Sequence, residues 1–344
     1  MSNSKGCQHG SNLTPIRSVV RSVGMSVPPR VVTNDYFSSY LDTSDQWIRE
    51  RTGISERRWV APGVSTSDLA MPACIEALDR AGLEASDVDG IIVATVTPDY
   101  AFPSTACFLQ KKLGSRGFAF DINAVCSGFI FAMVLADSLL KTGQAKRILV
   151  VGSDIYSNIL DHKDRSTCVL FGDGAGAMLL EAIPCVGEIS EQRGIIDSQI
   201  ISDGSHTDIL CVPIGSAKIP TPESLLRGEH FLTMEGKEVF RLAVRGLADI
   251  SKTLLKRAQV PVEELDYLVS HQANKRILNA VAKSLSLPDE KVPSNVEKYG
   301  NTSAASIPIL LSELDKSGQL QEGMLVMLSA FGGGVTWGAV LLRW

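Results

Sequence analysis

The chain has 344 residues, of which 44% are hydrophobic and 21% are charged, and its net charge is −5. This composition is typical of a soluble globular protein long enough for two cores, and it excludes the overall basic field of many nucleic-acid-binding proteins. We expect no membrane span, because no run of about 18 apolar residues occurs. Residues 1–15 are polar, do not resemble a signal peptide and predict a disordered extension, so we expect a cytoplasmic protein.

Seven cysteines and five histidines are scattered along the chain, without a CxxC pair or closely spaced ligands. In a chain of this size, that pattern argues against both a disulfide framework and a zinc site. We therefore expect no metal, and we expect most thiols to behave as small buried hydrophobic groups.

The first half of the chain alternates apolar strands with a helix. Residues 87–96 form a continuous apolar run, residues 129–144 have a helical pattern, and residues 147–154 form a second apolar strand. A Gly-rich turn then leads into a third strand within 171–182. Strands that are apolar throughout indicate a sheet covered on both faces.

The second half repeats this order. Residues 264–273 form the strand, residues 298–319 the turn and helix, and residues 323–344 two closing strands. Cys126 precedes the Gly of "KTGQ" by seventeen residues, and Asn301 precedes the Gly of "KSGQ" by the same seventeen.

The repeat predicts an α/β fold of two duplicated halves that pack around a pseudo-twofold axis. We place an N-terminal half at residues 16–185 and a C-terminal half at residues 186–344. The strand-to-helix turns that contain Cys126 and Asn301 are then equivalent, and both face one shared cleft.

Three side chains at strand-to-helix turns are candidates for catalysis. Cys126 precedes a helix, whose N-terminus favours a thiolate, whereas a lone cysteine in an apolar segment is more often structural. His271 ends an apolar strand, and Asn301 follows a glycine in ordinary turn chemistry. Each signal is weak alone, but a Cys, a His and an Asn together form a known nucleophilic arrangement.

The Gly-rich segments "FGDGAGA" and "FGGGVTWG" do not match phosphate-binding loops. A hairpin, or a close approach of the backbone to a substrate, explains them better. Backbone N–H groups of "FGGG" near a thioester carbonyl would form an oxyanion hole.

Six separated motifs occur in the order of one known family: "DTSDQWIRERTGI", "AVCSGF", "DRSTCVLFGDGAGA", "SHQANKRI", "YGNTSAASIP" and "AFGGGVTWG". From about residue 16 to the C-terminus, the chain resembles β-ketoacyl-acyl carrier protein synthase III. The resemblance implies a thiolase-like fold with five layers, α-β-α-β-α. It also implies decarboxylative Claisen condensation of an acyl-CoA primer, acetyl-CoA above all, with malonyl-acyl carrier protein. The products would be 3-oxoacyl-acyl carrier protein, coenzyme A and CO2, at the start of fatty acid synthesis.

The resemblance also implies roles for individual residues. Cys126 would carry the acyl group, and His271 and Asn301 would bind the malonyl thioester carbonyl and stabilise the enolate. The backbone amides of Cys126 and Gly333 would form the other oxyanion hole. Coenzyme A would be a substrate rather than a cofactor, with no separate cofactor needed.

Further residues are implied as contacts of the substrates and of a partner subunit. The coenzyme A path would include Thr43, Trp47, Arg51, Arg165, Gly236, Phe240, Ala273 and Asn274. Phe331 would line the acyl pocket, and Phe102 would reach into that of the other subunit of a homodimer. A basic patch for the acidic carrier protein would comprise Arg241, Arg245, Lys275, Arg276 and Lys283.

Several alternatives differ in identifiable features. A degradative thiolase normally has a second catalytic cysteine near the C-terminus, but no cysteine follows Cys211. A plant-type polyketide synthase has a different Gly-rich loop from "FGGG". A non-catalytic paralogue would lose the nucleophile. A secondary-metabolite synthase of the same subfamily would keep every motif, and the primer, whether acetyl, longer or branched, stays open.

Overall fold

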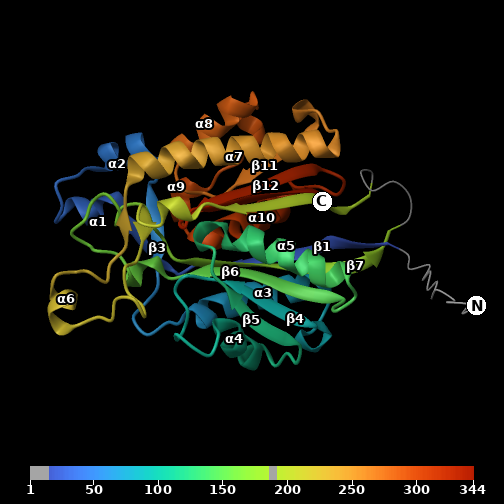
Figure 1. The fold of residues 1–344 in the computed structure, drawn as a ribbon, viewed down its shortest axis with the longest axis horizontal. Coiled ribbons are helices and arrows are strands. Elements are labelled where there is room, and N and C mark those ends of the chain that lie inside the picture. The colour runs from blue at the N-terminus through green and yellow to red at the C-terminus, as the bar shows by residue number, and fades with distance from the viewer. Residues whose placement is uncertain (1–14, 186–191) are drawn as a thin grey trace, which may run out of the picture.

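A computed structural model describes residues 15–185 and 192–344 (Figure 1). Disorder was expected for residues 1–15, of which residues 1–14 lie outside the described part. The predicted boundary between the halves, at residues 185 and 186, coincides with the start of the second gap and stays a prediction.

Two sheets of similar topology form the centre of the molecule. The first sheet has the order β1 (Ile16–Ser26), β7 (Gly174–Pro184), β6 (Arg147–Asp154), β4 (Gly90–Ala94), β5 (Phe118–Ile122). The second has the order β8 (Gly194–Ser202), β13 (Thr336–Arg343), β12 (Leu325–Gly332), β11 (Tyr267–Ser270). In both sheets, two parallel neighbours, β4 with β6 and β11 with β12, are followed by two antiparallel strands. The repeat predicted from the sequence is therefore present in the order and direction of four strands.

Helices cover the outer faces of both sheets and fill the space between them, as Figure 1 shows. The first outer layer contains α3 (Thr66–Ala81) and α4 (Thr105–Leu113), the central layer α5 (Gly128–Lys141) and α10 (Ser306–Lys316), and the second outer layer α7 (Gly236–Ala258) and α8 (Lys275–Leu285). The five-layer α-β-α-β-α arrangement is thereby confirmed.

Shorter elements surround these layers. They are β2 (Arg30–Thr33), β3 (Glu56–Trp59), β9 (Leu210–Cys211), β10 (Thr233–Met234), α1 (Asn34–Ser38), α2 (Asp45–Thr52), α6 (Pro222–Leu226) and α9 (Val296–Tyr299), with the 3-10 turns η1 (Ala85–Asp87), η2 (Val125–Ser127), η3 (Tyr156–Asn158), η5 (Gly204–His206), η6 (Val262–Glu264), η7 (Asp289–Lys291) and η8 (Ser303–Ala305). The predicted strands over 87–96 and 264–273 are shorter in the structure, because a 3-10 turn precedes each of β4 and β11.

The composition of each helix follows from its layer. Helix α5 packs against both sheets, and its buried residues Phe129, Ile130 and Met133 belong to the core that joins them. Helix α7 packs on one sheet only, so a single apolar stripe that includes Leu247 and Leu254 is buried. A helix with two covered faces needs apolar residues around most of its circumference, whereas a surface helix needs only one stripe.

The Gly-rich segment "FGDGAGA" has two parts: Phe171 lines a cavity, and Gly174 and Gly176 belong to the buried start of strand β7. A Cβ atom on Gly176 would lie 2.7 Å from Cβ of Pro308, and one on Gly174 would lie 2.8 Å from Cδ1 of Ile309. These glycines let helix α10 approach strand β7 closely. For Gly174 and Gly176, the close approach is therefore between a helix and a sheet, whereas the part of the segment that contains Phe171 reaches the cavity.

The two equivalent turns have the same backbone conformation. Each is a 3-10 turn that opens with a residue of positive φ, Val125 at 49° and Ser303 at 51°, and leads directly into a central helix. By this conformation, Cys126 corresponds to Ala304 rather than to Asn301. The seventeen-residue spacing therefore identifies the correct pair of turns but misaligns them by three residues, because α10 is three residues shorter than α5.

Candidate active site

Cys126 lies in η2, between strand β5 and helix α5, at the helix start that the sequence predicts. Its side chain is 4% exposed. Burial raises the pKa of the thiol to about 12, although hydrogen bonding by the hydroxyls of Ser303 and Tyr156 opposes the shift. Desolvation therefore disfavours the anion more strongly than the local hydrogen-bond donors favour it.

The turn between β12 and β13 is fastened to the Cys126 turn. The Thr336 hydroxyl lies 3.0 Å from the Ala124 carbonyl oxygen and 2.8 Å from the Ser127 hydroxyl. A Cβ atom on Gly332 would lie 2.7 Å from the backbone nitrogen of Cys126. Only glycine fits there, so the "FGGG" segment runs alongside the backbone of Cys126.

His271 follows strand β11, and its Nδ1 atom lies 2.7 Å from Oγ of Ser306. The same hydroxyl accepts the Gln272 amide proton at 3.2 Å, so its own proton can be donated to Nδ1. In that tautomer, Nε2 carries the imidazole proton. Burial lowers the pKa of His271 to about 4, although a hydrogen bond with the Ser303 backbone opposes the shift. His271 is therefore neutral near pH 7.

Asn301 is held by its backbone and by one side-chain oxygen. Its backbone N–H donates to the Leu170 carbonyl at 2.8 Å, and its carbonyl accepts the Gly172 N–H at 3.0 Å. The side-chain Oδ1 accepts the Ser303 N–H at 2.9 Å. The acceptor end of the amide is thus used internally, and the Nδ2 end is the donor that a ligand can meet.

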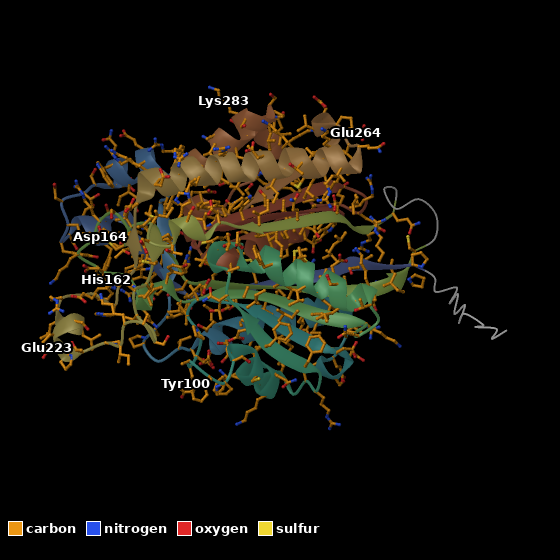
Figure 2. The ribbon with its side chains drawn as sticks, viewed as in Figure 1. Tyr100, His162, Asp164, Glu223, Glu264 and Lys283 are labelled. Carbon is orange, nitrogen blue, oxygen red and sulfur yellow. The ribbon has the colours of Figure 1, made fainter. Side chains whose placement is uncertain are left out.

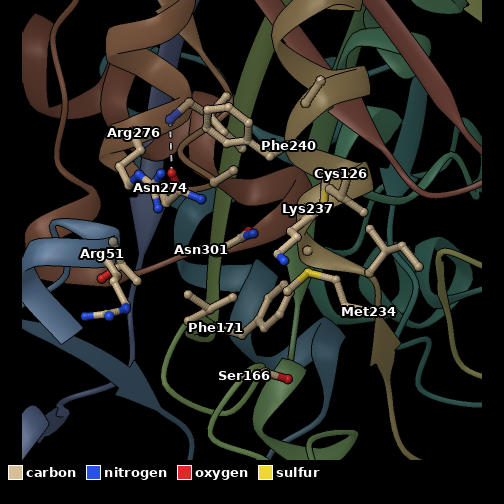
Figure 3. A pocket seen from close by; sticks show the side chains of 18 of the residues that line it. Arg51, Cys126, Ser166, Phe171, Met234, Lys237, Phe240, Asn274, Arg276 and Asn301 are labelled. Carbon is tan, nitrogen blue, oxygen red and sulfur yellow. Dashed lines mark hydrogen bonds between the residues drawn. The ribbon is translucent and has the colours of Figure 1, made fainter. Parts of the chain in front are cut away.

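These three residues line one cavity of about 520 Å³. Figure 3 shows Cys126 and Asn301 in this cavity with Phe240, Asn274 and Arg276. Eleven of the predicted catalytic, coenzyme A and acyl-pocket residues line it, as does Arg276 of the predicted docking patch: Trp47, Arg51, Cys126, Arg165, Gly236, Phe240, His271, Ala273, Asn274, Asn301 and Phe331. The structure therefore brings together residues that are more than 280 positions apart in the sequence.

Helix α2 brings Trp47 to this cavity. The Ser44 hydroxyl caps the helix by accepting the Trp47 N–H at 3.1 Å, and Gly53 ends it with a φ of 78°. A Cβ atom on Gly53 would lie 2.6 Å from Cβ of Lys275, so the end of α2 packs against the start of α8. This contact fixes α2, and with it Trp47 and Arg51, beside the cavity.

Two guanidinium groups contact the Trp47 ring. The Cζ atom of Arg51 lies 4.4 Å from the ring centre, and that of Arg165 lies 5.1 Å from it. Arg165 also donates to the backbone oxygen of Asp42. A planar ligand between two stacked groups needs a separation of roughly 7 Å, so Arg165 must move before a ring can enter.

The cavity has a strongly positive lining. Four cationic side chains, Arg51, Arg165, Lys237 and Arg276, line it, and no Asp or Glu occurs among its described lining residues. A chain with a net charge of −5 therefore carries a local site suited to an anionic ligand such as a phosphate ester.

Three predicted site residues lie outside the lining. Thr43 precedes α2, and Gly333 follows Gly332 in the turn between β12 and β13. Phe102 is 86% exposed in the loop between β4 and α4, near Tyr100, which Figure 2 shows at the edge of the molecule. Phe102 therefore does not line the cavity of its own chain.

The predicted docking residues divide into two groups. Arg241 and Arg245 on α7 pair with Glu238 and Asp249 of the same helix, so their charges are partly compensated. Lys275, Arg276 and Lys283 are exposed on α8, where Figure 2 shows Lys283 projecting into solvent.

Sequence reasoning missed several residues that shape the site. Lys237 lines the cavity and follows the predicted Gly236, so its place in the same motif could have suggested it. Ser306 was part of a quoted motif, but only the fold brings its hydroxyl to His271. Phe171 was also part of a quoted motif but was given no role, and Met234 is an apolar wall residue without a distinctive signal in the sequence.

The five-layer fold and a cavity that holds a Cys, a His and an Asn define the class of thiolase-fold condensing enzymes. Two family models match, one described as "3-Oxoacyl-[acyl-carrier-protein (ACP)] synthase III" over residues 120–204, and the other as its C-terminal part over residues 255–344. The chain belongs to the β-ketoacyl-acyl carrier protein synthase III family.

Similar proteins cover nearly the whole chain. The β-ketoacyl-acyl carrier protein synthase III of Chelativorans sp. (strain BNC1) is 49% identical over 330 residues, which are 96% of this chain and 100% of the relative. The crystal structure of the synthase III from Aquifex aeolicus VF5 has a TM-score of 0.86 at 42% identity, over 95% of this chain and 100% of its own. The priming β-ketosynthase of the R1128 polyketide pathway has a TM-score of 0.87 at 30% identity, over 97% and 99% of the two chains.

Proposed function

We propose that the protein joins an acyl-CoA primer to malonyl-acyl carrier protein by decarboxylative Claisen condensation. The products are 3-oxoacyl-acyl carrier protein, coenzyme A and CO2, and the reaction starts fatty acid synthesis. The observation that carries this proposal is that Cys126, His271 and Asn301 line one cavity. Four cationic side chains also line it, and its described lining contains no Asp or Glu. The cations suit the phosphates of coenzyme A and the phosphodiester of the carrier's prosthetic arm.

Cys126 takes the acyl group in the first half of the reaction. Its sulfur attacks the thioester carbonyl, and backbone N–H groups of Cys126 and Gly333 stabilise the oxyanion. The hydrogen bonds of the Thr336 hydroxyl with Ala124 and Ser127 support this oxyanion hole, because they hold the "FGGG" turn beside Cys126. The apolar walls, which include Phe171 and Phe331, exclude water from the acyl-enzyme.

His271 and Asn301 act in the second half. Loss of CO2 from the malonyl group leaves an enolate, whose oxygen needs neutral hydrogen-bond donors rather than a base. The hydrogen bond between the Ser306 hydroxyl and Nδ1 of His271 leaves the imidazole proton on Nε2. The Ser303 N–H occupies Oδ1 of Asn301, so Nδ2 remains as a donor for the substrate. The enolate carbon then attacks the acyl group on Cys126, and the thiol is released.

The substrate path runs past Trp47 and Arg165 toward Cys126. Trp47 and Arg165 hold the adenine ring, while Arg51, Thr43, Gly236 and Asn274 follow the rest of coenzyme A. Phe240 and Ala273 line the inner part of the path. Coenzyme A enters as the thioester substrate, and the reaction needs no separate cofactor or metal.

The carrier protein docks beside the cavity on the exposed face of α8. Lys275, Arg276 and Lys283 attract its acidic surface, and the paired Arg241 and Arg245 contribute less. Lys275→Glu combined with Lys283→Glu tests this part, because neither residue lines the catalytic cavity. A rise in KM for malonyl-carrier protein, without a change in KM for acetyl-CoA, supports this docking face.

The working enzyme is a cytoplasmic homodimer in which Phe102 enters the acyl pocket of the other subunit. Its 86% exposure in one chain supports this role, because a large aromatic side chain is rarely left in water. None of the helices in the described parts of the chain is long and apolar enough to cross a membrane.

Incubation with radiolabelled acetyl-CoA and malonyl-carrier protein tests the proposal. We expect labelled acetoacetyl-carrier protein, and we expect the Cys126→Ser variant to form no acyl-enzyme. Acylation of that variant at the normal rate would contradict the mechanism. A panel of longer, branched and aromatic primers tests the alternative of a secondary-metabolite synthase, which the likeness to the R1128 priming ketosynthase supports. Strong preference for such a primer over acetyl-CoA would favour that alternative.

A further inference from the structure

We propose that Lys237 binds the phosphate group at the outer end of the pantetheine arm, which coenzyme A and the carrier's prosthetic arm share. This inference rests on the proposed function and deepens it, because it assigns a specificity-determining residue for both thioester substrates. Lys237 follows Gly236 at the start of α7, and it lines the cavity that contains Cys126. Figure 3 shows its side chain pointing into this cavity.

The three arginines that line the cavity each contact an aromatic ring of its wall. Arg51 and Arg165 lie over Trp47, with 4.4 and 5.1 Å from their Cζ atoms to the ring centre. The Cζ atom of Arg276 lies 5.6 Å from the ring centre of Phe240. Part of the surface of each guanidinium group is therefore already occupied by the protein itself.

Lys237 differs from these arginines in having an unpaired charge. Within residues 15–185 and 192–344, its ammonium group forms no ion pair and no hydrogen bond with another side chain. The acid next to it in the sequence, Glu238, accepts instead from Arg241 at 3.0 Å on the same helix. An unpaired ammonium group that points into a cavity is suited to bind an anionic group of a ligand.

Helix α7 follows the cavity from its exposed side to its buried interior. Lys237, Phe240, Ala243 and Leu247 all line the cavity, and their spacing of three or four residues places them on one face of the helix. Lys237 is exposed and Phe240 is half-buried, whereas Ala243 and Leu247 are buried. The rise from Lys237 to Leu247 is about 15 Å, a length comparable to that of an extended phosphopantetheine arm. This face therefore offers a cation at its outer end and apolar groups along the rest of the arm.

Two anionic groups of the substrates are candidates for this cation, a phosphate and the malonyl carboxylate. His271 and Asn301, which act on the malonyl group, are buried, whereas Lys237 is exposed. The carboxylate also leaves as CO2, so an ion pair that stabilised it before the reaction would slow its loss. A phosphate stays unchanged in both half-reactions, and its binding opposes no chemical step. The phosphate is therefore the favoured partner of Lys237.

Binding of two ligands that differ by one phosphate tests this inference without turnover. We would titrate the full chain with 4′-phosphopantetheine and with pantetheine, under reducing conditions, and measure both dissociation constants by calorimetry. The wild-type protein should bind the phosphorylated ligand roughly tenfold more tightly, the size of one charge-assisted hydrogen bond. Lys237→Met should remove this preference, because methionine keeps an apolar stem without the charge. Lys237→Arg should retain most of it.

Lys256→Met is the matched control. Lys256 is also an exposed lysine of α7, but it does not line the cavity, so the variant removes the same charge from the same helix. We expect this control to keep the tenfold preference for 4′-phosphopantetheine. Equal loss of the preference in Lys237→Met and Lys256→Met would contradict a direct contact, because it would show an effect of overall charge.

A preference for 4′-phosphopantetheine that survives in Lys237→Met would overturn the inference. A rise in KM confined to malonyl-carrier protein, with unchanged binding of 4′-phosphopantetheine, would assign Lys237 to the malonyl carboxylate and would also overturn it. Normal condensation of acetyl-CoA with malonyl-carrier protein by the wild-type protein, together with either result, would leave the proposed function intact.

Discussion

The Nδ1 atom of His271 lies 2.7 Å from the Ser306 hydroxyl oxygen, which makes the first turn of α10 a support for the imidazole. The two residues are 35 positions apart, and both are buried. Ser306 does not line the cavity itself but contacts His271, which does, so it is a positioning residue that acts through His271.

Ser306→Ala should impair the decarboxylation half of the reaction and spare the acylation half. Without the hydroxyl, Nδ1 loses its donor, and the imidazole can protonate on either nitrogen. We expect malonyl-carrier protein decarboxylation to slow by about tenfold, the cost of one hydrogen bond, while acetylation of Cys126 keeps its rate. Ser312→Ala on the same helix is the control. Equal loss in both half-reactions would show that Ser306 supports the fold only.

His271 should titrate far below a free histidine. Burial lowers its pKa to about 4, so the ring stays neutral from pH 8 down to about pH 5 and becomes protonated only near pH 4. NMR of ¹⁵N-histidine-labelled protein, with the signal assigned by its absence in His271→Gln, measures this titration. A midpoint near 6.5 would contradict the buried neutral imidazole and its role as a neutral donor.

Asn301→Asp should abolish most of the decarboxylation. The substitution keeps the oxygen that accepts the Ser303 N–H but replaces the donor Nδ2 with a second acceptor. An acceptor that faces a developing enolate repels it, so we expect a loss of about 10² to 10³-fold in kcat for condensation. Labelled acetyl-CoA should still acylate Cys126. Retention of condensation within a factor of three would refute the role of Nδ2 as the donor.

Arg165→Ala should weaken the nucleotide end of the substrate and leave the chemistry intact. In the structure, the guanidinium stacks on Trp47 at 5.1 Å, which is too close for a ring to lie between them. Removal of the side chain eliminates one of the two groups that would stack on the adenine ring, and it removes one positive charge from the cavity. We expect KM for acetyl-CoA to rise about tenfold with kcat nearly unchanged. Acetyl-pantetheine, which has no adenine, is the matched substrate, and an equal effect on both thioesters would contradict this role.

Arg57→Met should destabilise the protein by roughly 3 kcal/mol. Arg57 is fully buried and donates to the backbone oxygens of Val32 and Val169 at 3.1 and 2.6 Å, so its loss leaves buried acceptors unpaired. Urea unfolding measures the change in free energy. Arg58→Met is the control, because Arg58 pairs with Glu56 near the surface and should cost less than about 1 kcal/mol. Equal values for the two variants would contradict this account.

The duplication and the nature of the site residues could be predicted from the sequence. Apolar strands and central helices leave a strong local pattern, since a strand or helix covered on two faces needs apolar residues at most positions. The order of the strands confirms that pattern. The residue-by-residue alignment of the two turns could not be predicted from spacing, because the helices that follow them differ in length. The backbone angles of Val125 and Ser303 show which positions correspond.

The family motifs also identified most of the cavity, because Cys126, His271, Asn301 and the coenzyme A residues are distinctive in type and spacing. Lys237, Ser306 and Phe171 required the fold, since their contacts join segments far apart in the chain. Charge compensation of Arg241 and Arg245 also depends on side-chain geometry along α7.

By itself, the sequence determined the duplicated α/β architecture and singled out Cys126, His271 and Asn301 as candidates for catalysis. Only the tertiary structure decided their ionisation: the thiol and the imidazole are both neutral because they are buried where the two halves meet. The ionisation of these two groups depends on desolvation and on neighbours from distant segments, and the residues adjacent to Cys126 in the sequence indicate neither.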